Sequence, residues 1–65
     1  MHTYSIKILV HNSLEWSESV RIFQTKVLDS LNIDISRIFS ATNEDLIRIE
    51  EIASECKIKI QFTKL

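Results

Sequence analysis

The sequence predicts a small two-layer α+β or α/β domain, in which two helices cover one face of a three-stranded sheet and leave the other face open. Apolar and polar residues alternate in the first and the last segment, and apolar residues recur every three or four positions in two segments between them. The predicted order is therefore β-α-β-α-β. A chain of 65 residues with 45% hydrophobic and 26% charged residues is typical of one globular domain, spanning 1–65.

The first element is a strand over residues 4–11. Apolar residues on one predicted face of this strand alternate with the residues of its other face. A strand with this period of two buries one face only. The predicted buried positions are Tyr4, Ile6, Ile8 and Val10.

The last element is a second strand, over residues 56–63, in which Cys56, Ile58, Ile60 and Phe62 alternate with polar residues. Strands covered on both faces read as continuous apolar runs, whereas strands covered on one face alternate. Because both terminal strands alternate, we expect both helices to lie on the same side of the sheet. The lone cysteine, Cys56, is in phase with the apolar positions and is interpreted as a core residue.

The first helix is predicted between Asn12, as its N-terminal cap, and Asn32. Its apolar stripe has the spacing of one helix face. Asn12 with Glu15 resembles a capping box before it, and Asn32 can take the left-handed position that often ends a helix. The stripe consists of Trp16, Val20, Phe23, Val27 and Leu31.

The second helix is predicted over residues 43–55. Thr42 can cap it, with Asp45 three residues later. Its acidic side chains could bind a metal or act as acids and bases, but acids on the polar face of a helix usually serve solvation. The predicted apolar stripe is Leu46, Ile49, Ala53 and Cys56.

Residues 33–40 leave two alternatives open. Ile33, Ile35 and Phe39 fit a strand, whereas Ile35, Ile38 and Phe39 fit a short helix opened by Asp34. The strand completes the predicted three-stranded sheet.

Glycine and proline are both absent, although average usage would give about seven or eight of them together in a chain of this length. Phosphate-binding loops, dinucleotide-binding turns and nucleophile elbows all need glycine, so this chain cannot contain any of these three motifs in its standard form. Together with the small size, this predicts no enzyme activity, no catalytic or metal-binding residues and no cofactor.

One cysteine and no visible signal peptide or long apolar run predict a cytoplasmic protein that does not span a membrane. Eleven isoleucines beside two alanines suggest AT-rich coding, as in phages and other mobile elements.

Charge is segregated along the chain. Residues 1–11 and 56–65 carry four lysines and no acid, whereas residues 12–55 carry four basic and nine acidic residues. The open sheet face is therefore expected to be basic and to bind an anionic partner. The alternative is that the lysines only prevent edge-to-edge aggregation. The candidate partner-binding residues are Lys7, Leu9, His11, Lys57, Lys59 and Gln61.

Parts of the chain resemble KH RNA-binding domains: residues 6–14 resemble the opening strand, residues 35–39 the short helix, and residues 46–60 the second helix and the strand after it. This resemblance implies RNA binding through the Gly-x-x-Gly loop. The loop would fall at Ser40-Ala41-Thr42-Asn43 or one residue later, where no glycine occurs.

The function expected is therefore non-enzymatic binding of a macromolecular partner, as in a small inhibitor, adaptor or anti-defence protein. A protein partner is expected first, and RNA bound by a degenerate KH-like module with a basic sheet face is the alternative. A thin core and projecting apolar residues, Leu9 and Ile38, predict a homodimer formed through a strand edge or the open face.

Overall fold

The computed structural model describes residues 1–10 and 16–65 and contains three strands and two helices in the predicted order. In chain order, they are β1 (His2–Val10), α1 (Trp16–Leu31), β2 (Phe39–Ala41), α2 (Asn43–Glu55) and β3 (Lys59–Lys64).

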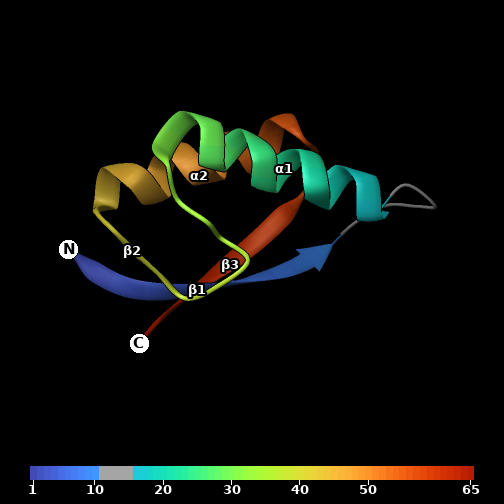
Figure 1. The fold of residues 1–65 in the computed structure, drawn as a ribbon. Coiled ribbons are helices and arrows are strands. Elements are labelled where there is room, and N and C mark those ends of the chain that lie inside the picture. The colour runs from blue at the N-terminus through green and yellow to red at the C-terminus, as the bar shows by residue number, and fades with distance from the viewer. Residues whose placement is uncertain (11–15) are drawn as a thin grey trace.

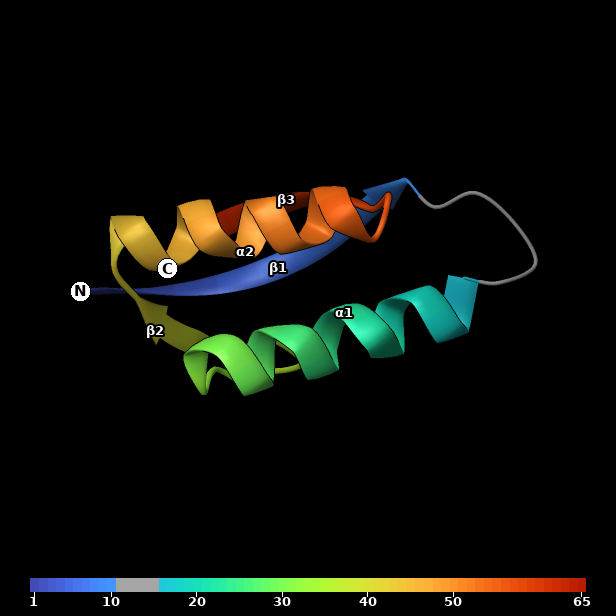
Figure 2. The same cartoon turned by 90° about the horizontal axis from the view of Figure 1, so that it is seen from above.

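The elements form two layers, with both helices on one side of the sheet (Figure 1). Seen from above, α1 and α2 lie side by side and run in opposite directions (Figure 2). The prediction that both helices cover the same face is thus confirmed. No described element covers the opposite face of the sheet (Figure 1).

The sheet has the strand order β2-β1-β3, and both pairs are antiparallel. β2 pairs only with the start of β1, from His2 opposite Ala41 to Tyr4 opposite Phe39. β3 follows β1 for longer, beginning with Tyr4 opposite Lys64. The first strand of the chain is therefore the central one.

The predicted alternation of β1 is confirmed from Tyr4 to Ile8, and the side chain of Val10 lies outside the description. Tyr4 is buried, and Ile6 and Ile8 pack half-buried against the core, whereas Lys7 is exposed. The alternation is interrupted near the end of the strand. Ile8 pairs with Ile60, and the preceding residue of β3, Lys59, pairs with Val10 instead of Leu9. Leu9 is therefore an extra residue in a β-bulge.

α1 packs through three residues of the predicted stripe, and the side chain of Trp16 lies outside the description. Phe23 and Val27 are fully buried, and Leu31 packs against them at the end of the helix. Asn32 adopts the predicted left-handed conformation, with φ 58°, and its N–H donates to the Leu28 carbonyl oxygen at 2.8 Å. The capping box predicted at residues 12–15 lies outside the described residues.

α2 begins with the predicted capping box. The Asp45 N–H donates to Thr42 Oγ1 at 3.1 Å, and the Thr42 N–H donates to Asp45 Oδ2 at 3.0 Å. Ile49 and Ala53 are buried as predicted. Ile52, which the predicted stripe omitted, is also fully buried.

Residues 33–38 correct the prediction for the middle segment, because they form neither a continuous strand nor a short helix. The Ser36 N–H donates to Asp34 Oδ1 at 3.1 Å, and the Ser36 hydroxyl donates to the same oxygen. These hydrogen bonds, with a smaller contribution from Arg37, lower the pKa of the Asp34 carboxyl. This local turn takes precedence over the strand pattern, and extended backbone resumes only at Phe39.

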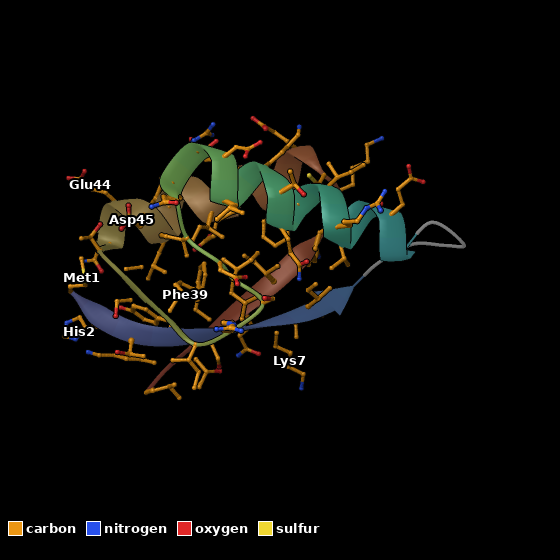
Figure 3. All side chains as sticks on the ribbon, viewed as in Figure 1. Met1, His2, Lys7, Phe39, Glu44 and Asp45 are labelled. Carbon is orange, nitrogen blue, oxygen red and sulfur yellow. The ribbon has the colours of Figure 1, made fainter. Side chains whose placement is uncertain are left out.

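Three aromatic rings, one from each strand, join the sheet to the core. The ring centroid of Tyr4 lies 6.3 Å from Phe39 and 6.2 Å from Phe62, and those of Phe39 and Phe62 are 6.5 Å apart. Phe39 points into the space between the sheet and the helices (Figure 3). Pairs at these separations stabilise the core beyond the area that they bury.

One-sided burial makes a prediction about the two faces of the sheet. We expect Ile8→Ala and Ile60→Ala to lower the free energy of unfolding by about 2 kcal/mol, because both side chains pack against the core but are only partly buried. Gln61→Ala should cost less than about 1 kcal/mol, because its side chain is exposed on the other face. Leu9→Ala should also cost less than about 1 kcal/mol, because the Leu9 side chain is 49% exposed in the bulge. Denaturant melts of the four variants measure the difference. A cost for Gln61→Ala equal to that of the isoleucine variants would mean that both faces of the sheet are covered.

Candidate partner-binding surface

The face of the sheet opposite the helices is the main candidate surface. β1 contributes alternate residues to it, and their partners on the neighbouring strands lie opposite: Lys7 faces Gln61, and Ser5 faces Thr63. Lys7 points away from the helices (Figure 3). We call this surface the open face; it consists of Thr3, Ser5, Lys7, Ser40, Lys59, Gln61 and Thr63.

Three of the predicted site residues meet on the open face. Lys7 and Gln61 are direct partners across β1 and β3, and Lys59 is two residues before Gln61 on the same strand. All three are exposed. The structure therefore brings two ammonium groups and one amide to neighbouring positions of one surface.

Lys57 does not join this group. The predicted strand began at Cys56, whereas β3 begins at Lys59. Lys57 instead lies in the turn after α2, with φ 59°, where the Ile58 N–H donates to the Ala53 carbonyl oxygen at 2.9 Å and ends the helix. Lys57 is exposed but off the strand, and His11 lies outside the described residues.

Leu9 belongs to a second feature, a groove of about 300 Å³ between α2 and the beginning of β3. Leu9 is 49% exposed, and the bulge places it beside the start of β3. The lining of the groove is nearly as polar as it is apolar, and its charged residues are Glu50 and Lys59. Its lining residues are Leu9, Glu50, Ala53, Ser54, Ile58, Lys59 and Ile60.

The two layers carry opposite charge, as predicted. β1 and β3 carry three lysines and no acidic residue. α2 carries five acidic residues and one basic residue, Arg48, for a net charge of −4. Arg48 Nη1 lies 3.6 Å from Glu51 Oε1, and both side chains are largely exposed. The sheet layer is therefore basic, and the acidic charge lies mainly on α2.

The α2 carboxylates do not converge on a metal site. Within the described part of the chain, no three His, Cys, Asp or Glu side chains lie close enough to hold a metal ion. Cys56 is half-buried and packs against the core, which agrees with its interpretation as a core residue. Among residues 1–10 and 16–65, no helix is both long enough and apolar enough to cross a lipid bilayer.

The open face differs from the sheet surfaces that bind single-stranded RNA, where aromatic rings stack on the bases. Tyr4, Phe39 and Phe62 all lie on the helix-facing side of the sheet. The open-face residues, as far as the chain is described, are lysines and uncharged polar residues. This face therefore offers charge and hydrogen bonds but no stacking platform.

Two segments compared with a KH domain also differ from that pattern. Ile35 and Ser36 form a turn where a short helix is implied, and Phe39 begins β2. The place of the Gly-x-x-Gly loop is occupied by the end of β2 and by Thr42, the N-cap of α2.

Sequence reasoning missed most of the groove. Glu50, Ser54 and Ile58 become its lining only through the packing of α2 against β3, and no spacing in the sequence indicates this. Thr3, Ser5 and Thr63 of the open face could have been found from the period of two.

No protein-family model matches this sequence, and neither the curated proteins nor the solved structures give a match.

Proposed function

We propose that this protein is a non-enzymatic binding protein whose open face recognises an acidic surface of a protein partner. The observation that supports the proposal most is the uncovered sheet face on which Lys7, Lys59 and Gln61 lie together, on strands without a single acidic residue. Complementary charge guides association and favours one partner over others. A small cytoplasmic inhibitor, adaptor or anti-defence protein, encoded by a phage or another mobile element, would act in this way.

A protein partner is preferred to RNA because of where the aromatic rings lie. The rings of Tyr4, Phe39 and Phe62 take part in the core and cannot stack on bases. RNA binding remains the second candidate function, since the lysines of the open face could contact phosphates.

Reversing the charge of the open face tests the proposal. We expect Lys7→Glu/Lys59→Glu to abolish capture of the partner from the native host, because two attractive charges become repulsive. The melting temperature should change little, since exposed charges contribute little to folding. Capture by tagged protein, followed by mass spectrometry and a binding titration with the recovered partner, measures the effect.

The matched control is Lys26→Glu, which reverses an exposed lysine on α1, in the other layer. It should leave binding unchanged. Partner binding that survives the double reversal would contradict the proposal and move the interface to the helices. A single-stranded RNA oligonucleotide that binds tightly, with an affinity falling steeply as salt rises, would instead support the second candidate.

The proposal includes homodimerisation. A domain with a single core of this size rarely gains more than about 3–5 kcal/mol from it, so that pairing of two copies adds needed stability. A second copy would also double the number of open faces and strengthen the binding of a repeated partner.

A further inference from the structure

The outer edge of β3 is unpaired along the whole strand in the described part of the chain. β3 pairs with β1 on one side, and the described residues provide no strand on its other side. An unpaired edge presents a row of backbone N–H and C=O groups that can pair with another strand. The edge strand is KIQFTK, in which lysines stand only at the ends.

The hydrogen bonds to β1 show which residues of β3 direct their backbone groups outward. The Leu65 N–H donates to the Thr3 carbonyl oxygen at 2.9 Å. The backbone N–H and C=O groups of successive residues point to alternate sides along an antiparallel strand. The backbone groups of Thr63 and Gln61 therefore also point toward β1. Ile60, Phe62 and Lys64 therefore direct their N–H and C=O groups away from β1, toward the free edge.

We propose that this edge pairs with the same edge of a second copy, antiparallel and with a two-fold axis at Gln61, to form one six-stranded sheet. The inference rests on the homodimer of the proposed function and assigns its surface. In this register, Ile60 lies opposite Phe62 of the second copy, and the outward-directed groups of both residues meet. An axis at Phe62 would instead set Lys64 against the apolar Ile60.

Charge complementarity supports the second copy as the occupant. Lys64 is in phase with Phe62 and pairs with the buried Tyr4, so its position belongs to the helix-facing side of the strand. Across the proposed axis, Lys64 of the second copy lies opposite Ile58, which lines the groove together with Glu50. The basic end of one β3 thus approaches the acidic α2 of the other copy, and it does so twice in the dimer.

Cross-linking tests the register directly. On the axis, the two copies of residue 61 form a pair without direct hydrogen bonds, with Cα atoms about 4.5 Å apart, which lies within the range of about 4.4–6.8 Å seen in disulfides. We expect Gln61→Cys to form a disulfide-linked dimer on mild oxidation, located by non-reducing peptide mapping. The control, Thr63→Cys, faces residue 59 of the second copy and should not link to itself.

A charge exchange tests the contact with the groove. We expect Lys64→Glu and Glu50→Lys each to raise the dimer Kd about tenfold or more, because two symmetry-related attractions become repulsions. The double variant should restore the wild-type Kd. Sedimentation over a roughly hundredfold range of protein concentration measures it, since the dimer fraction depends on concentration.

Several outcomes would overturn the proposal. A wild-type protein that stays monomeric over this range, a disulfide at residue 63 instead of residue 61, or a double variant that dimerises no better than the single ones would each do so. Lys7→Glu lies on the central strand, away from the β3 edge. Lys7→Glu should lose partner binding and keep the dimer. The edge variants should lose the dimer and keep partner binding, so that the two proposals can fail separately.

Discussion

Phe23→Ala is expected to unfold most of the protein at room temperature. Truncating a fully buried phenylalanine costs about 3–5 kcal/mol, which is the whole stability that a core of this size usually supplies. Phe23 lies in the predicted stripe of α1, so its loss also removes the anchor of that helix. Far-UV circular dichroism and denaturant melts measure the loss.

The control is Ile22→Ala, at the adjacent position of the same helix, where the side chain is 42% exposed. This variant should lose less than about 1 kcal/mol. If both variants were equally stable, the result would contradict the burial of the α1 face that carries Phe23.

The second large effect is expected for Ile49→Ala on α2. Ile49 is fully buried, and removing it should cost about 2–5 kcal/mol, because the surrounding side chains close the cavity only partly. Ile47 provides a control of the same residue type on the same helix, since its side chain is 61% exposed. Ile47→Ala should change the free energy of unfolding by less than about 1 kcal/mol.

These two isoleucine variants make the comparison independent of residue type and helix propensity, since both replace isoleucine by alanine within one helix. Thermal and denaturant melts of both report the difference. A cost for Ile47→Ala as large as that for Ile49→Ala would show that a partner or a second copy covers the outer side of α2.

The parts of the fold that were predicted from the sequence depend on local chemistry. Thr42 and Asp45 hydrogen-bond to each other across one turn, so their spacing alone identifies the start of α2. Asn32 ends α1 through its own backbone conformation. The alternation along β1 and β3 depends only on the pleat of a strand, and it correctly placed Lys7 and Gln61 on the open face.

The parts that were not predicted depend on contacts between distant residues. The bulge at Leu9 exists because β1 and β3 shift register at that point, which neither strand indicates alone. Ile52 is fully buried although the predicted stripe omitted it, because the width of the covered face of α2 depends on the elements that pack against it. In residues 33–38, a turn built on Asp34 replaced the expected strand, since its side-chain hydrogen bonds compete with extended backbone.

The central position of β1 has a consequence for how the protein folds. Tyr4 pairs with Lys64 and Ile8 with Ile60, so the longest ladder of the sheet joins segments that are far apart in the chain. Such pairing is slow, because the entropy of closing a long loop is lost before the contacts form. Until β3 arrives, β1 has only the three-residue β2 beside it, and the edge of β1 that β3 later covers is available to other chains. We therefore expect folding to be slower than in helical domains of this size, and aggregation during folding to increase with protein concentration.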